Sequence, residues 1–76
     1  MNKIALLIAK NQTTKSVVIT DTNLELEDFV VNYVKQSNYY SFTILSNDTK
    51  VLRGLISTDE NEPNPENTLG LIAFID

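Results

Sequence analysis

The sequence predicts an α+β fold, a two-layer sandwich in which one helix covers one face of a mainly antiparallel sheet. Three observations lead to this prediction: one segment has helical periodicity, five segments are apolar or alternating, and two of these five form a hairpin pattern. The expected order is β-β-α-β-β-β. The 76 residues, 42% of them apolar, are expected to form a single domain, 1–76, with a small core.

Two strands are expected at the start of the chain. The apolar run at residues 4–9 predicts a strand at 3–9 that is buried on both faces. Residues 16–20 are almost all β-branched, which predicts a second strand antiparallel to the first. The apolar run falls short of the roughly 7–15 residues of a secretory signal. A cytoplasmic location is therefore expected.

A helix is expected at residues 23–37. Apolar side chains recur there at spacings of three and four: Leu26, Phe29, Val30, Tyr33 and Val34. Thr22 and Glu25 have the spacing of a capping box, and Asn38 suits the left-handed position after the last turn. Phe29 is expected to be among the most buried residues.

The second half of the chain predicts a hairpin and a final strand. Residues 39–46 alternate between apolar and polar, 47–49 form a turn, and 50–57 return with Leu52 and Ile56 on one face. The segment at 58–67 contains no apolar side chain except its two prolines and is expected to be an exposed loop. Residues 69–75 predict the last strand.

Composition argues against an enzyme. The chain has no His and no Cys, which removes the commonest general base, the commonest zinc ligands and the commonest reactive nucleophile. The carboxylates at Glu25, Glu27 and Asp28 are explained by the favourable position of acids at a helix N-terminus. We expect no catalytic residue, no metal site and no cofactor.

The chain's formal charge of −4 is unevenly distributed. Residues 1–38 sum to zero, and four acids of the second half lie in one short segment without a base: Asp59, Glu60, Glu62 and Glu66. This acidic segment is interpreted as a contact for a basic protein partner or, alternatively, as a solubilising loop. An EF-hand is excluded because Asn64 replaces the required glycine and Gly70 the final glutamate.

The absence of a basic stripe argues against direct nucleic-acid binding. No segment has the apolar length of a membrane span. Tyr39 and Tyr40 are adjacent, so that in a strand they face opposite sides. One is expected in the core, and the other is a candidate protein contact because surface tyrosines are favoured at interfaces.

One helix covers only one face of a sheet. The other face is expected to expose apolar residues such as Leu7, Leu71 or Ala73, and a homodimer is the simplest way to cover them. The sequence therefore predicts a small acidic protein–protein interaction module of the inhibitor or adaptor type, without catalysis. The alternative is a self-assembling structural homo-oligomer with no separate partner. The Asn-rich composition is common in small proteins of AT-rich bacteria and phages.

Overall fold

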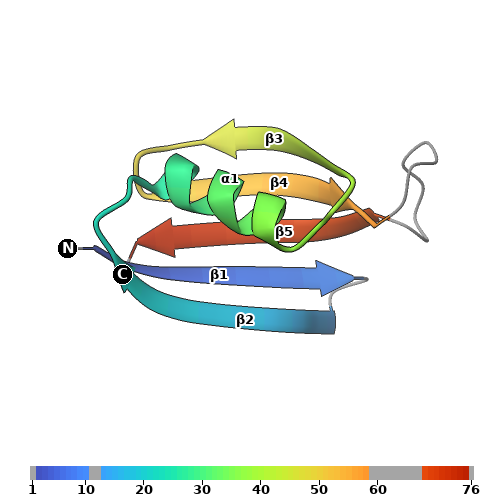
Figure 1. The fold of residues 1–76 in the computed structure, drawn as a ribbon, viewed down its shortest axis with the longest axis horizontal. Coiled ribbons are helices and arrows are strands. Elements are labelled where there is room, and N and C mark those ends of the chain that lie inside the picture. The colour runs from blue at the N-terminus through green and yellow to red at the C-terminus, as the bar shows by residue number, and fades with distance from the viewer. Residues whose placement is uncertain (1, 11–12, 59–67, 76) are drawn as a thin grey trace.

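The computed structural model describes residues 2–10, 13–58 and 68–75. Within these ranges five antiparallel strands form one sheet and one helix packs on it, which confirms the predicted fold class and element order. The elements in chain order are β1 (Asn2–Lys10), β2 (Thr13–Thr22), α1 (Leu26–Gln36), β3 (Ser41–Asn47), β4 (Val51–Ser57) and β5 (Thr68–Ile75) (Figure 1).

The sheet has the strand order β2-β1-β5-β4-β3, and every neighbouring pair is antiparallel. The last strand, β5, therefore lies between the hairpin formed by β1 and β2 and the hairpin formed by β3 and β4 (Figure 1). Its residue Ala73 pairs with Leu6 of β1 on one side and Leu52 of β4 on the other. The two hairpins thus share one sheet, with β2 and β3 at its edges.

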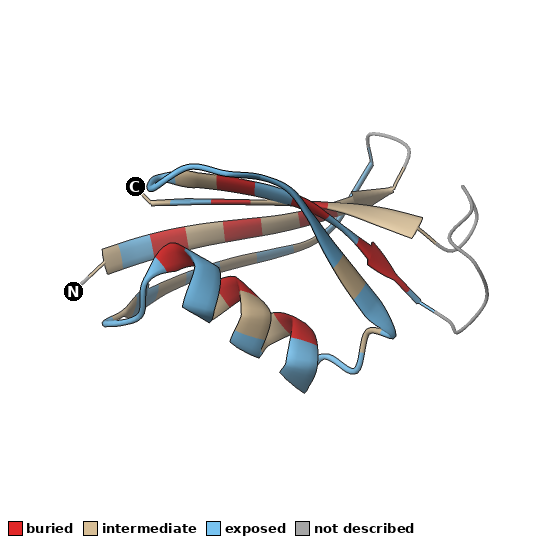
Figure 2. Ribbon diagram, turned by 90° about the horizontal axis from the view of Figure 1, so that it is seen from above, coloured by how far each residue is buried: buried red, intermediate tan, exposed pale blue. Residues whose placement is uncertain are grey.

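The core lies between α1 and one face of the sheet (Figure 2). Because neighbouring residues of a strand point to opposite faces, alternate residues of the three central strands lie under the helix. The buried apolar side chains are Ile4, Leu6, Ile8, Leu26, Val30, Val34, Leu52, Ile56, Leu71 and Ala73. The central strands and α1 supply all of these residues, so the described core is one layer thick.

The helix begins later than predicted, at Leu26, and the predicted capping box is wrong. The N-cap residue is Glu25, and no side chain caps the helix through a hydrogen bond. Thr22 belongs to the end of β2, where its Oγ1 accepts a hydrogen bond from the backbone N–H of Leu24 at 3.1 Å. At the other end, Asn38 has a φ of 61°, which confirms the predicted left-handed residue after the last turn.

The prediction that Phe29 is among the most buried residues is wrong. The buried line of α1 is Leu26, Val30 and Val34, which are spaced by four residues. Phe29 lies on the flank of this line and is only partly buried. It lines a groove between α1 and β2 together with Tyr33.

The two terminal strands bury one face fully, not two. Leu71 and Ala73 were expected on the uncovered face, but their pairing with the helix-facing residues of β1 places them under α1. The residues of β5 that face away from the helix are Ile72 and Phe74. Leu7 lies on that same uncovered face, as predicted, and is half-buried.

Both edge strands contain a β-bulge. The extra residue is Lys15 in β2 and Leu45 in β3, where the pairing with the neighbouring strand shifts by one residue. A bulge bends the strand and interrupts the regular row of outward-facing backbone N–H and C=O groups. Both edges of the sheet are therefore irregular.

Candidate protein-interaction surface

The face of the sheet opposite α1 is covered by no described element (Figure 2). We call it the open face. Its residues, in strand order from β2 to β3, are Thr14, Val17, Ile19, Asp21, Lys3, Ala5, Leu7, Ala9, Thr68, Gly70, Ile72, Phe74, Val51, Arg53, Leu55, Ser57, Ser41, Thr43, Leu45 and Ser46. The face is formed by all five strands; its middle is apolar, and one end is polar, with Thr14, Ser41, Thr43, Ser57 and Thr68.

The strand register places the apolar side chains of the open face in rows across the sheet. One row consists of Ile19, Ala5, Phe74 and Val51. In the next row the apolar side chains are Val17, Leu7 and Ile72, and the row ends at the charged Arg53. The side chains near the sheet edges protrude most, with 65% of Ile19, 62% of Leu45 and 54% of Val17 exposed. Single exposed apolar residues are ordinary, whereas contiguous rows of them are typical of interaction surfaces.

A hollow of about 350 Å³ lies on the open face, between β1, β5 and β4. Its lining is mostly apolar and includes Leu7, Leu55 and Ile72. Gly70 contributes to the hollow because it has no side chain: a Cβ at this position would meet only the backbone oxygen of Ala9, at 3.8 Å. The hollow is wide and open to solvent.

The charged groups of the open face are few and do not form a catalytic arrangement. Lys3 and Asp21 are opposite each other at one end, on β1 and β2. Arg53 on β4 is the charged residue that lines the hollow. None of these positions brings a general base next to a nucleophile, which acid–base or covalent catalysis requires. The surface can bind by apolar contact, with Arg53 as a hydrogen-bond donor.

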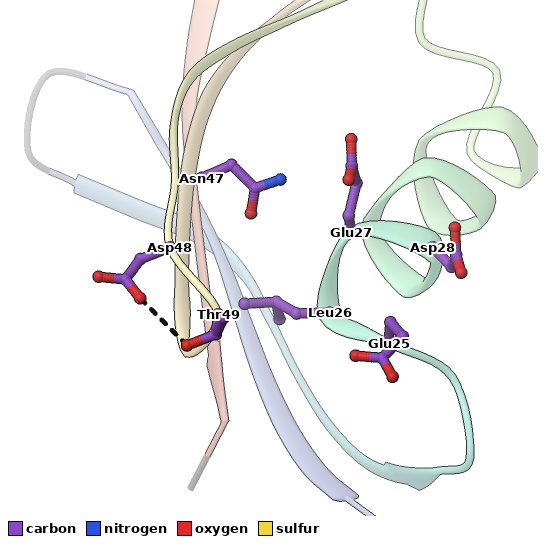
Figure 3. A pocket seen from close by; sticks show the side chains of 7 residues that line it. All are labelled: Glu25, Leu26, Glu27, Asp28, Asn47, Asp48 and Thr49. Carbon is purple, nitrogen blue, oxygen red and sulfur yellow. Dashed lines mark hydrogen bonds between the residues drawn. The ribbon is translucent and has the colours of Figure 1, made fainter.

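A second hollow, of about 340 Å³, lies where the first turn of α1 faces the β3–β4 turn (Figure 3). Its lining residues are Glu25, Leu26, Glu27, Asp28, Asn47, Asp48 and Thr49. The carboxylates point apart, and the hydroxyl of Thr49 donates a hydrogen bond to Asp48 at 3.2 Å (Figure 3). Among the described residues, no three His, Cys, Asp or Glu side chains are grouped to hold a metal ion.

The prediction that the two candidate tyrosines belong to a strand is wrong: β3 begins at Ser41, and Tyr39 and Tyr40 lie in the connection between α1 and β3. Tyr39 packs against the core, and its pKa is raised by burial and by the neighbouring Tyr33. Tyr40 is 62% exposed, and its backbone N–H donates a hydrogen bond to the carbonyl oxygen of Ser57 at 2.9 Å. The side chain of Tyr40 is thus available to solvent, while its backbone is fixed to the end of β4. A partner-binding role for these tyrosines stays a prediction.

The acidic segment lies outside the described residues. Asp59, Glu60, Glu62 and Glu66 all belong to the range 59–67. Their role as a partner contact stays a prediction from the sequence. The structure describes the strands on either side of this range, β4 and β5, which are antiparallel neighbours.

Sequence reasoning missed most residues of the open face. It expected an uncovered apolar face but named Leu7 alone correctly among its residues. Val17 and Ile19 were not predicted on this face, because a β-branched segment indicates a strand without showing which side of the strand is covered. A usable signal was the alternation of Ser16, Val18 and Thr20 with these two residues, since it separates a more polar face from an apolar one.

Within the described part of the chain, no helix has the length and apolar character needed to cross a lipid bilayer. No family model matches the sequence, and the comparisons with curated proteins and with solved structures found no match.

Proposed function

We propose that this chain is a non-catalytic protein–protein interaction module that acts in the cytoplasm and binds protein through its open face. The observation that carries the proposal is the pair of adjacent rows that are apolar across β2, β1 and β5 and end at the protruding side chains of Val17 and Ile19. Burying such side chains removes apolar surface from water, at roughly 25 cal/mol per Å². This gain favours association with a protein surface of matching shape.

The shape of the open face favours a protein over a small molecule. A small-molecule site encloses most of its ligand and orients it with several polar groups. The hollow beside Gly70 is open and mostly apolar, with Arg53 as its charged group. A protein interface has an apolar centre with few charges, and arginine is enriched there.

The acidic residues support a second contact on the same module. Glu25, Glu27 and Asp28 lie around the start of α1, on the helix side of the sheet. The acidic segment, with Asp59, Glu60, Glu62 and Glu66, adds four negative charges between β4 and β5 in the sequence. An inhibitor or adaptor of this kind would use these acids to speed association with a basic partner, because exposed charges act mainly on the encounter rate.

Site-specific photo-cross-linking in the native cells tests the proposal. A benzophenone side chain replaces Ile19 or Phe74 on the open face in separate variants, and the exposed Gln36, in the last turn of α1 and away from its acidic first turn, in the control. The two open-face positions are expected to give defined protein adducts, and the control is not. Folded variants that form no protein adduct at either open-face position would overturn the proposal.

A self-assembling homo-oligomer with no separate partner is the second candidate function. It is favoured by the small core of a chain that contains no cysteine and so has no disulfide to support it. This candidate predicts that affinity capture of the chain from its native cells recovers it alone, at a fixed oligomer mass, with no stoichiometric second protein.

A further inference from the structure

We infer that the occupant of the open face is a second copy of this chain, packed face to face as a symmetric dimer in which the two sheets form the inner layers. The inference rests on the proposed function and names its partner. In such a dimer each α1 lies on the outside, and the order of layers is helix, sheet, sheet, helix. The same surface serves on both copies, as a two-fold interface requires.

The area of the open face matches what a stable dimer needs. Strands lie about 4.8 Å apart and rise about 3.4 Å per residue, so five strands of this length present a face of roughly 24 by 25 Å. That is about 600 Å² in projection, and the accessible area of protruding side chains is larger. A standard interface buries about 800 Å² on each partner. Stacking two copies therefore gives an interface of ordinary size.

The edges of the sheet favour stacking over pairing of strands between copies. Strand pairing needs a regular row of free N–H and C=O groups along an edge. The bulge at Leu45 interrupts that regularity in the middle of β3, and the bulge at Lys15 interrupts it near the start of β2, where the lysine also adds a charge to the edge. Bulges and edge lysines are known devices against edge-to-edge association. The faces are thus better suited to contact than the edges.

The charge distribution also favours two copies meeting at this face. The charged side chains of the open face are Lys3, Asp21 and Arg53, whereas the whole chain carries a net charge of −4. The acids around the start of α1 lie on the opposite side of the sheet. Face-to-face packing keeps these acids apart and brings together surfaces with few like charges, which reduces the repulsion between two acidic molecules.

The small size of the core also favours a dimer. The described core is one layer between α1 and the sheet, and a domain of about this size buries only about 60% of the surface of its unfolded chain. Oligomerisation is a usual support for a small domain without disulfides. Covering Leu7, Ile72 and Phe74 would add a second apolar layer on the other side of the same sheet.

Sedimentation velocity of the full chain at tens of micromolar tests the inference. We expect a species of twice the 8.6 kDa mass of the chain. The variant Val17→Lys with Ile19→Lys places two charges on the open face of each copy and is expected to sediment as a monomer. The matched control, Asn32→Lys with Gln36→Lys, adds the same charge on the exposed side of α1 and is expected to stay dimeric.

A second, more conservative variant controls for the case in which the Lys variant does not fold. Val17→Thr with Ile19→Thr keeps β-branched side chains at both positions, and we expect it to raise the dimer dissociation constant at least tenfold while its circular dichroism stays native. A wild-type chain that sediments as a monomer at tens of micromolar overturns the second-copy inference. If the open face of this monomer still forms adducts with another protein in cells, the proposed function stands and only the second-copy inference fails. If it forms no such adducts, the proposed function fails together with the inference. A dimer that persists in the Lys variant and slows amide exchange along β2 overturns the inference in favour of edge pairing.

Discussion

Substituting Gly54 tests how closely β3 and β4 approach each other beneath the aromatic ring of Phe42. A Cβ built at Gly54 would lie 2.6 Å from Cε1 of Phe42 and 2.8 Å from the backbone oxygen of Thr43. The ring can shift, but the carbonyl belongs to the paired backbone of β3 and moves only with the strand. The absence of a side chain at position 54 is therefore a requirement of close packing, and Gly54→Ala removes it.

The expected cost follows from two opposing terms. Overpacking a well-packed site costs about 1–3 kcal/mol. Replacing glycine lowers the entropy of the unfolded chain, which stabilises the folded state by about 0.4–1 kcal/mol. The net destabilisation is about 1–2 kcal/mol, and each kcal/mol corresponds to a fall in melting temperature of about 4–8 °C for a domain of this size.

Gly70→Ala is the matched control, because the nearest atom to its added Cβ is the Ala9 oxygen at 3.8 Å, an ordinary contact. Neither glycine has a positive φ, so only the available space distinguishes them. Urea melts followed by circular dichroism, run in the Val17→Lys, Ile19→Lys background to exclude association, should show Gly54→Ala destabilised and Gly70→Ala unchanged or slightly stabilised. Equal stability of the two alanine variants would refute the packing argument.

Four further predictions concern the core, the helix end and pH. Leu6→Ala, in the fully buried centre of β1, should cost about 2–5 kcal/mol in a denaturant melt. Phe29→Ala should destabilise the chain clearly less than Leu6→Ala, because Phe29 lies on the flank of α1. An equal loss of stability would mean that Phe29 belongs to the core. Asn38→Val should lower the free energy of unfolding by about 1–2 kcal/mol, because valine is disfavoured in a left-handed backbone, whereas Asn38→Gly should leave it unchanged. Identical melts of the two variants would contradict this. The raised pKa of Tyr39 stabilises the fold at pH values below the ordinary tyrosine pKa near 10, and this stability is lost as pH rises through the raised pKa. Between pH 9 and 11 the melting temperature should therefore fall less steeply for Tyr39→Phe than for the wild-type chain. Equally steep falls would exclude a contribution of Tyr39 to the pH dependence of stability.

The elements could be predicted from the sequence because each one depends on local pattern. The alternation around Leu52 and Ile56 identified both the strand and its buried face, since it separates apolar from polar residues. Asn38 was predicted because few residues other than glycine adopt a positive φ at low cost. Pairing with a neighbour extended β1, β2 and β5 beyond their predicted apolar centres, whereas β3 and β4 began one or two residues later than predicted.

The open face could be predicted only in outline, because its residues depend on which strands become neighbours. Both Leu71 and Ile72 are apolar, so the pattern of β5 alone does not say which of them faces the helix. That choice is made by the pairing of Leu71 with Ile8, a contact between the two ends of the chain. Phe29 was misplaced for a related reason: size and spacing put it on the helix stripe, but the position of α1 over β4 and β5 decides the buried line.

The most direct test of the central claim is the solvent accessibility of the open-face methyl groups in the assembled protein. In a methyl-labelled sample with a soluble gadolinium chelate, paramagnetic relaxation reports how closely solvent approaches each Ile, Leu and Val side chain. We predict that the methyl groups of Leu7, Leu55 and Ile72 are shielded almost as well as those of Leu6 beneath α1, and that the Val17→Lys, Ile19→Lys variant loses this shielding. Open-face methyl groups that relax as strongly in the wild-type chain as in that variant would contradict the claim that this face is a contact surface.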